Sequence, residues 1–256
     1  MGRRAVALVA VLLGMGCSSA TAAEPGCEAG DDGALRVLFI GNSLTYFNGM
    51  PYMFAALADS VGEPEPVVQM IASPDFGLPE HWELGRAQDA IRRGCWDVVV
   101  LQQGPSSLAE SRVVLLDYAA RFGDLIRANG GRTALLSVWP SASRRTDFDR
   151  AIESYAQAAQ AVDGLLLPAA TAWLETWERD PQVPLYADAL HPTPEGSYLA
   201  AAVTVARLYG RSPTELPAGV EYRIAGEGRQ ILSLDAATAD VLREAAAAAL
   251  EHHPDD

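Results

Sequence analysis

Residues 35–45 read Leu-Arg-Val-Leu-Phe-Ile-Gly-Asn-Ser-Leu-Thr, a nearly continuous apolar run that ends at a glycine and a serine. Four more apolar runs follow along the chain, at 67–71, 97–101, 133–138 and 165–167. Runs of Val, Leu and Ile without polar alternation are typical of strands buried on both faces of a parallel sheet. The sequence therefore predicts five parallel strands.

Segments with the periodicity of α-helices lie between and after these predicted strands. Apolar residues recur every three or four positions at about 50–61, 80–93, 109–129 and 147–162, and again at about 169–178, 194–210 and 236–250. Right-handed crossovers through such helices cover both faces of the sheet. We predict an α/β fold, a three-layer α/β/α sandwich around a flavodoxin-like five-stranded parallel sheet. It forms one domain over 35–250, followed by a polar tail, 251–256, that is expected to fray.

Composition and motifs exclude several classes of function. The 256-residue chain has a formal net charge of −14, which disfavours nucleic acid and anionic lipid surfaces as partners. The sequence contains no His-x-x-x-His or paired Cys-x-x-Cys cluster, and no glycine-rich nucleotide motif follows a strand. We expect neither a metal nor a cofactor.

The first 23 residues have the pattern of an export signal. Arg3 and Arg4 precede an apolar stretch, and small residues at 20–23 offer a cleavage site. Cleavage there leaves a short mature segment, 24–34, before the domain. Gly16-Cys17-Ser18 also suits a lipoprotein signal that ends before Cys17, so lipidation of Cys17 stays open. We expect an exported protein that is secreted, periplasmic or anchored to a membrane as a lipoprotein.

Two cysteines remain if Cys17 is removed or lipidated. Cys27 and Cys95 then form an even pair in a compartment that permits disulfides. A bridge between them would attach the mature N-terminus to the core. The alternative is a free Cys95 buried beside Trp96.

Ser43 follows the first predicted strand directly. In an open α/β sheet the ligand crevice lies at the carboxyl ends of the strands. Gly41 allows a sharp turn there, so Ser43 can point into the crevice as a nucleophile. Taken alone, the motif favours a serine that only caps or turns the chain, which is the commoner role of a serine after a strand.

A carboxylate and an imidazole, Asp188 and His191, stand three residues apart just before a predicted helix. The carboxylate could fix the tautomer of the ring, which would then accept the serine proton and return it to a leaving alcohol. Of the four histidines, His252 and His253 lie in the tail, and His81 has no carboxylate at a comparable distance apart from its neighbours Glu80 and Glu83. We prefer His191 as the base. The alternative for the pair is a surface ion pair of little energetic value.

Residues 39–45, which end in Gly-Asn-Ser-Leu-Thr, resemble the first block of SGNH/GDSL hydrolases. The stretch from Asp188 through His191 to Pro192 resembles the last block, DxxH. The two blocks occur in the correct order at the ends of the alternating pattern. The resemblance implies that Ser43, Asp188 and His191 form a catalytic triad.

Members of this family usually place three donors around the oxyanion: the N–H of the nucleophile, a glycine N–H after the second strand, and an asparagine in a GxND block. The resemblance therefore implies Ser43 as the first donor and makes Gly77 the candidate for the second, with a plain turn glycine as the alternative. After the third strand the chain reads Leu-Gln-Gln-Gly instead, which resembles the QG block of sialate-O-acetylesterase-like relatives. A glutamine amide can also donate, so we assign Gln103, with Gln102 as the alternative. The other possibility is a glutamine that ends the strand by pairing with loop backbone.

The expected activity is hydrolysis of a small acyl ester, acetyl by resemblance alone, of a carbohydrate or other alcohol through an acyl-enzyme on Ser43. The expected partner is thus a small-molecule or carbohydrate ester, with no nucleic acid, and with membrane contact only through lipidated Cys17. Because the GxND asparagine is missing, a non-catalytic glycan-binding protein on the same fold is the alternative.

Overall fold

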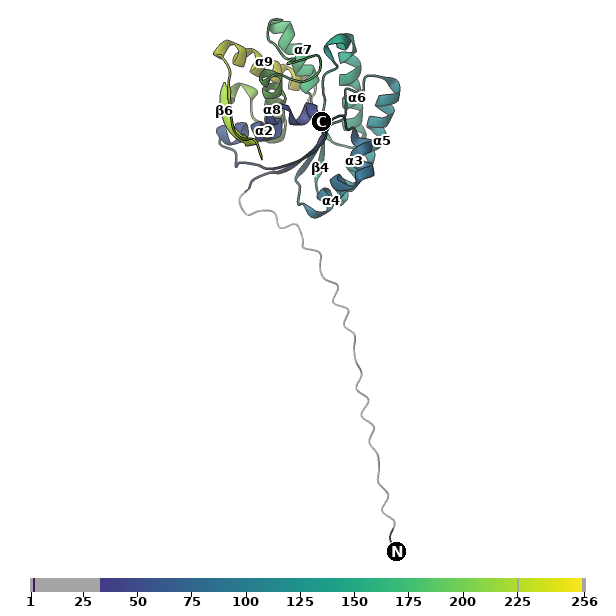
Figure 1. The fold of residues 1–256 in the computed structure, drawn as a ribbon. Coiled ribbons are helices and arrows are strands. Elements are labelled where there is room, and N and C mark those ends of the chain that lie inside the picture. Colours follow the sequence, from purple (N-terminus) through teal and green to yellow (C-terminus); the bar gives the residue numbers. More distant parts are fainter. Residues whose placement is uncertain (1, 3–32, 225, 255–256) are drawn as a thin grey trace.

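The computed structural model describes residues 2, 33–224 and 226–254, and a five-stranded parallel sheet lies at its centre (Figure 1). The strands are β1 (Arg36–Gly41), β2 (Val67–Ala72), β3 (Val98–Leu101), β4 (Arg132–Leu136) and β5 (Leu165–Leu167). Their order is β2-β1-β3-β4-β5, and every neighbouring pair is parallel. This order reverses between β1 and β3, which creates a switch point where ligands bind in such sheets.

Helices cover both faces of the sheet, as expected for a three-layer α/β/α sandwich. One layer contains α2 (Met50–Ser60), α7 (Ala169–Arg179), α8 (Pro194–Tyr209) and α9 (Ala236–His252). The other contains α3 (Leu78–Leu84), α4 (Arg86–Arg93), α5 (Ala109–Ala128) and α6 (Phe148–Ala161) (Figure 1). The predicted fold class and the five predicted strands are confirmed.

The sheet is buried because its strands are apolar on both faces. Residues 37–40 of β1 and 99–101 of β3 are almost completely inaccessible to solvent. Ile40 pairs with Leu101, and Gly41 pairs with Ala72. The residues that follow β1, β2 and β3 therefore emerge at the same edge of the sheet.

Short irregular elements connect the sheet to its helices. They are α1 (Ser43–Tyr46) and the 3-10 helices η1 (Phe47–Gly49), η2 (Ala142–Asp147) and η3 (Pro213–Glu215). Both α1 and η1 directly follow β1, and η2 follows β4.

The structure differs from the sequence-based prediction at three places. The helix expected at 80–93 is two helices, since Gly85 has a φ of 75° and ends α3. A hairpin of β6 (Gly219–Ile224) and β7 (Gly228–Ser233) was not predicted. The prediction of a fraying polar tail at 251–256 is wrong for its first residues. Helix α9 continues to His252, and Nε2 of the His253 ring lies 3.0 Å from Thr171 Oγ1.

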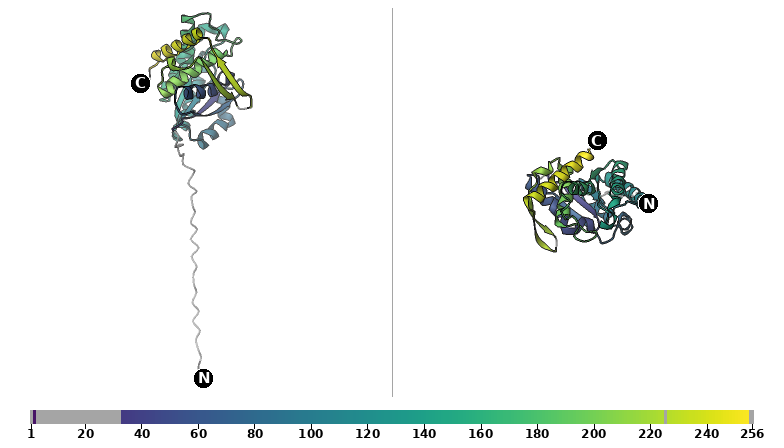
Figure 2. Two further views of the ribbon diagram at one scale, coloured as in Figure 1. Left: turned by 90° about the vertical axis from the view of Figure 1, so that its left-hand side faces the viewer. Right: turned by 90° about the horizontal axis from the view of Figure 1, so that it is seen from above.

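The β6–β7 hairpin lies outside the main sheet, beside the layer of α2, α8 and α9 (Figure 2). It packs on the turn after α1: a Cβ on Gly49 would collide with Ile224, and Tyr222 donates its hydroxyl to the carbonyl of Asn48 at 2.6 Å. Both Asn48 and Gly49 have positive φ, 53° and 64°. The hairpin thus covers the left-handed turn after α1 and fixes its conformation.

Cys95 is disulfide-bonded. The expected partner Cys27, the alternative lipidation site Cys17 and most of the predicted export signal lie outside the described residues. Within the ranges that the structure describes, no helix is both long and apolar enough to cross a membrane.

Candidate active site

The first strand brings Ser43 to the switch point of the sheet. Strand β1 ends at Gly41, Asn42 is extended, and α1 begins at Ser43. A Cβ on Gly41 would collide with the side chains of Thr45 and Gln102, so only glycine fits there. Ser43 is 8% exposed and lines a cleft. A ligand in this cleft can therefore reach its hydroxyl.

Three side chains from the two ends of the domain form a continuous chain of hydrogen bonds. His191 Nε2 lies 3.0 Å from Ser43 Oγ, and His191 Nδ1 lies 2.8 Å from Asp188 Oδ2. Because the carboxylate accepts from Nδ1, the proton sits on that nitrogen and Nε2 faces Ser43 as an acceptor. The structure thus brings the three predicted triad residues into the geometry of a nucleophile, a base and an orienting acid.

Asp188 is held in its ionised form. The hydrogen bond from the His191 ring lowers the pKa of Asp188 from 3.8 to about 2, aided by the backbone N–H groups of His191 and Leu190. Those two N–H groups lie 2.7 and 2.6 Å from Asp188 Oδ1. With one oxygen fixed by the backbone, the other points at the imidazole.

The loop that carries Asp188 and His191 is fixed from the side of β4. Trp139 Nε1 donates to the carbonyl of Leu190 at 2.9 Å, and the N–H of Ala142 donates to the carbonyl of Ala189 at 2.8 Å. Trp139 is almost fully buried and stacks on Trp173, with ring centroids 3.8 Å apart. The buried, stacked pair of Trp139 and Trp173 therefore supports the loop.

The turn after α1 holds the imidazole from the other side. The ring of Phe47 stacks on the ring of His191, with centroids 4.1 Å apart and planes 14° apart. Asn48 Nδ2 donates to the carbonyl of Pro192 at 3.0 Å and to Ser197 Oγ at 2.9 Å. Sequence reasoning missed both residues, although their position just after the Gly-Asn-Ser turn could have suggested them.

His81 occupies a structural position. Its Nε2 lies 2.7 Å from the carbonyl oxygen of Gly41, at the end of β1. Burial lowers its pKa, so the neutral ring donates to that carbonyl. His81 therefore supports the strand that leads to Ser43, whereas His191 faces the hydroxyl.

Gly77, expected to be the second oxyanion donor, lines the cleft but has its N–H engaged elsewhere. This N–H donates to Glu80 Oε2 at 2.8 Å. The carbonyl of Phe76, in the same peptide group, accepts from Asn42 Nδ2 at 2.8 Å. In a trans peptide the C=O and N–H point in opposite directions. The N–H of Gly77 thus points away from Asn42, and it is not free as the prediction requires.

The two glutamines after β3 are also occupied. Gln103 Nε2 donates to Ser106 Oγ at 3.1 Å and to the carbonyl of Ser111 at 3.4 Å, which uses both amide protons. Gln102 is fully buried: its Oε1 accepts from the N–H of Asn42, and its Nε2 donates to the carbonyl of Gln103. These contacts do not support the oxyanion role expected for Gln103 or Gln102. They make both glutamines supports of the cleft wall.

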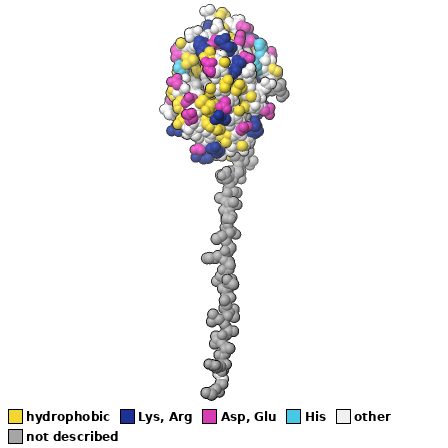
Figure 3. Space-filling model, turned by 90° about the vertical axis from the view of Figure 1, so that its right-hand side faces the viewer, with side chains coloured by type: hydrophobic (Ala, Val, Ile, Leu, Met, Phe, Trp, Pro, Cys, Tyr) yellow, Lys and Arg dark blue, Asp and Glu magenta, His cyan; other side chains and the backbone are white. Residues whose placement is uncertain are grey.

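The cleft beside Ser43 has a volume of about 570 Å³. Its charged lining residues are Asp75, Glu80 and Arg144, and serine hydroxyls and backbone form much of the remaining polar surface. One side is apolar and includes Pro79, Leu108 and Val114. The cleft can therefore accept a ligand with both polar and apolar parts. On the outer face over α3 to α6, hydrophobic side chains also gather among charged ones (Figure 3).

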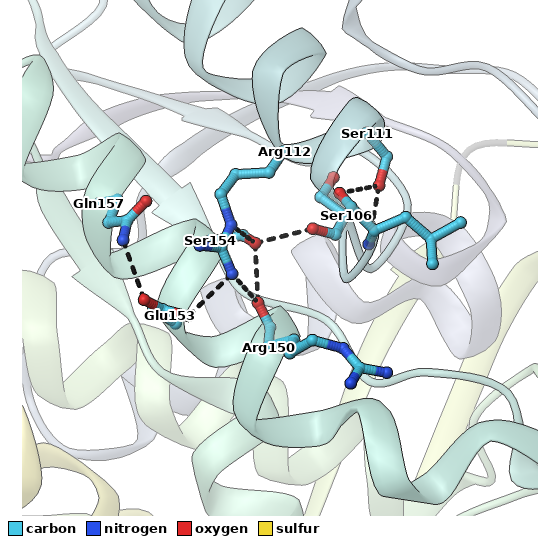
Figure 4. Close-up of polar contacts among 8 residues, drawn as sticks. Ser106, Ser111, Arg112, Arg150, Glu153, Ser154 and Gln157 are labelled. Atoms are coloured by element: carbon cyan, nitrogen blue, oxygen red, sulfur yellow. Dashed lines mark hydrogen bonds and ion pairs between the residues drawn. The ribbon is translucent and has the colours of Figure 1, made fainter.

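The wall formed by residues 103–111 is anchored to α6. Ser154 Oγ donates to the carbonyl of Ser106 at 2.7 Å, and Arg112 Nε donates to Ser154 Oγ at 2.8 Å (Figure 4). The buried hydroxyl of Tyr155 accepts from the N–H of Gln103 at 2.9 Å and lies 2.8 Å from its carbonyl. The wall is therefore a fixed surface of the cleft.

In the part of the chain that the structure describes, no three His, Cys, Asp or Glu residues come together in a group that could hold a metal ion. The chemistry described above uses only side chains and backbone of the chain itself.

Solved structures with the same fold are numerous, whereas no protein-family model and no curated protein matches the sequence. A protein from Slackia heliotrinireducens assigned to the SGNH hydrolases is 29% identical and has a TM-score of 0.60. The match covers 68% of this chain and 99% of that one.

Two further structures match at lower identity. A DUF4886 family protein from Bacteroides uniformis is 18% identical, with a TM-score of 0.66 over 87% of this chain and 96% of that one. A catalytic mutant of an acetylxylan esterase from Geobacillus stearothermophilus is 16% identical, with a TM-score of 0.54 over 69% and 95%.

Proposed function

Since the chain has an SGNH/GDSL-type hydrolase fold, we propose that it is an exported serine esterase that removes a small acyl group, acetyl first of all, from a carbohydrate or another alcohol. The observation that carries the proposal is the hydrogen-bonded series from Ser43 through His191 to Asp188. A serine esterase needs this series, and a capping serine or a surface ion pair does not.

In the proposed reaction, His191 Nε2 takes the proton of Ser43 Oγ while this oxygen bonds to the ester carbonyl carbon. The π electrons of the carbonyl move to its oxygen, which becomes an oxyanion. When the oxyanion collapses, the C–O bond to the alcohol breaks and the alkoxide leaves with the proton from His191. Water then attacks the acyl-enzyme with His191 as base and releases the acid and Ser43.

The first oxyanion donor in this proposal is the backbone N–H of Ser43. Ser43 is the first residue of α1, and the N–H groups of the first helical turn have no acceptor within the helix. An oxyanion formed on Ser43 lies beside that N–H. Losing one oxyanion donor typically costs about 3 to 4 kcal/mol of transition-state stabilisation.

The choice of acetyl and a carbohydrate has two supports. An acetylxylan esterase shares the fold, and the cleft presents serine hydroxyls and the guanidinium of Arg144 that could contact sugar hydroxyls. Export is proposed from the leader pattern of residues 1–23.

One observation favours the alternative of a non-catalytic glycan-binding protein. The side-chain amides of both Gln102 and Gln103 are committed to the cleft wall, so the third oxyanion donor expected from family resemblance is not in place. A fully hydrogen-bonded wall suits a binding cleft as well as an enzyme.

Turnover of a chromogenic acetate ester by the mature chain separates the two functions. We expect wild-type hydrolysis and loss of at least about 1000-fold in Ser43→Ala and in His191→Ala. Ser141→Ala is the matched control, because Ser141 lines the same cleft and its hydroxyl lies 3.2 Å from that of Ser143, outside the triad. It should retain activity.

A fluorophosphonate probe gives an independent reading. It should label wild-type protein at Ser43, as mapped by mass spectrometry of the labelled peptide, and leave Ser43→Ala unlabelled. A folded wild-type protein that neither hydrolyses acyl esters nor takes the label, yet binds glycans, would establish the binding function instead.

A further inference from the structure

Almost every polar atom of Asn42 has a defined partner. Its backbone N–H donates to Gln102 Oε1 at 2.8 Å, and its carbonyl accepts from the N–H of Thr45 at 2.9 Å. Its side-chain Oδ1 accepts from the N–H of Leu44 at 3.0 Å, as the N-cap of α1. Its Nδ2 donates to the carbonyl of Phe76 at 2.8 Å. These contacts hold the side chain in one orientation.

One donor of Asn42 remains. A primary amide nitrogen has two protons, and in the described part of the chain the carbonyl of Phe76 is the single acceptor that Nδ2 contacts. Asn42 is 8% exposed and lines the same cleft as the adjacent Ser43. The cap bond through Oδ1 also settles which end of the amide is nitrogen. A buried donor thus lies beside the nucleophile with one proton uncommitted.

The other expected donors near Ser43 are engaged or do not line the cleft. Gln102, whose Nε2 donates to the carbonyl of Gln103, is fully buried and is not among the residues that line the cleft. The N–H of Gly77 donates to Glu80, and the amide of Gln103 donates to Ser106 and Ser111. Among the residues that the structure describes, Asn42 Nδ2 has one partner and a second proton to donate, and a donor fixed beforehand beside the nucleophile is what an oxyanion hole requires. The second proton of Asn42 Nδ2 is the side-chain donor nearest in sequence to the nucleophile.

From these contacts we infer that Asn42 supplies the side-chain donor of the oxyanion hole. The inference rests on the proposed esterase function and deepens it. When Ser43 Oγ bonds to the carbonyl carbon and its proton passes to His191, the electron pair of the broken π bond resides on the carbonyl oxygen. That oxygen then accepts from the N–H of Ser43 and from the second N–H of Asn42 Nδ2. The amide is fixed beforehand by Leu44 and Phe76, so little reorganisation is required.

The discriminating variant is Asn42→Asp. A carboxylate keeps the oxygen that caps α1 at the N–H of Leu44, but it replaces both amide protons with an acceptor. We expect kcat on a chromogenic acetate to fall about 100- to 1000-fold with little change in KM. Asn42→Ser also keeps a capping oxygen without the negative charge. It should show a loss of the same order.

A boronic acid inhibitor tests the role without turnover. Its adduct with Ser43 places a tetrahedral oxygen in the hole, so its affinity should fall in parallel with kcat in both variants. A purely structural role would instead lower the melting temperature and leave the ratio of boronate affinity to substrate affinity unchanged. Asn129→Asp is the matched control, because Asn129 makes a similar amide contact with the carbonyl of Leu125 at the end of α5.

Two results would overturn the inference. If the Asn42→Asp and Asn42→Ser variants keep wild-type kcat and boronate affinity, Asn42 is not an oxyanion donor. The proposed esterase function would still stand. A wild-type protein that binds no boronate and hydrolyses no ester would overturn both this inference and the proposed function. Loss of kcat in both Asn42 variants, with Asn129→Asp unaffected, supports the inference.

Discussion

Gly196 offers a strong test of how the loop carrying His191 is positioned, because the residue lies beneath that loop in the first turn of α8. An added Cβ would lie 2.9 Å from the carbonyl oxygen of Leu185, 2.9 Å from Trp173 Cζ2 and 3.2 Å from Pro192 Cβ. Leu185 and Pro192 flank the loop that carries Asp188 and His191. The substitution Gly196→Ala therefore pushes on both ends at once.

The magnitude follows from those distances. Restoring an ordinary contact of about 3.4 Å requires a displacement of about 0.5 Å. Because a misplacement of about 1 Å can cost about 100-fold in rate, half of that should lower kcat/KM on the order of 10-fold. Overpacking costs about 1 to 3 kcal/mol of unfolding free energy, and alanine regains about 1 kcal/mol over glycine in a helix. The net destabilisation is at most about 2 kcal/mol.

The assay is steady-state hydrolysis of a chromogenic acetate together with thermal unfolding of the same sample. Pro194→Ala is the control, because Pro194 is exposed in the same helical turn, and it should change neither activity nor stability by a comparable amount. Wild-type kcat/KM in a folded Gly196→Ala variant would refute the reasoning that the close packing under the loop sets the position of His191.

Three other predictions use the same preparations. The hydrogen bond from His191 lowers the pKa of Asp188 to about 2, so its contribution to stability is complete above about pH 4 and disappears as the pH falls toward 2. Asp188→Asn should therefore lose less stability than wild type over that range in urea unfolding. Tyr155→Phe removes a fully buried hydroxyl from three backbone contacts and should lower the unfolding free energy by about 1 to 3 kcal/mol, as measured by urea titration. Val114→Ser should lower the ratio of kcat/KM for a hexanoate ester to that for an acetate ester, because Val114 lines the cleft. Val113→Ser, at a more exposed position outside the cleft, should leave this ratio unchanged. Equal ratios in the two variants would contradict the prediction.

The main sheet could be predicted because its signal is local. Each strand is a short apolar run whose burial on both faces requires helices on either side, and the order of runs and periodic segments then fixes the layers. The hairpin gave no such signal, because each of its strands has one buried residue, Tyr222 in β6 and Leu232 in β7, among exposed or half-buried ones. Its contacts with the Asn48–Gly49 turn depend on packing between distant segments, since Tyr222 and Asn48 are 174 residues apart.

The three residues of the hydrogen-bonded series, Ser43, His191 and Asp188, could be selected from the sequence, since residue type, order and the short spacing of Asp188 and His191 restrict the choice. The oxyanion donors could not, because a donor is defined by where an N–H points. The Phe76–Gly77 peptide has its carbonyl toward Asn42 and its N–H toward Glu80, and the opposite orientation is equally compatible with the sequence. The same limit applies to Gln103, whose amide could have faced either the cleft or the wall.

The hairpin that the sequence did not predict connects directly to the loop that carries His191, the proposed base. Tyr222 bonds to the carbonyl of Asn48, the amide of Asn48 bonds to the carbonyl of Pro192, and Pro192 adjoins His191. Phe47, the first residue of the same turn, stacks on the imidazole. Asn48 has a positive φ, which Asn adopts more readily than other non-glycine residues, and its bonds to Tyr222 and Pro192 fix the turn in that conformation. The imidazole is thus held between the hairpin-supported turn and the tryptophan-supported loop, so changes in either one should alter the distance between Nε2 and Ser43 Oγ, and with it the rate.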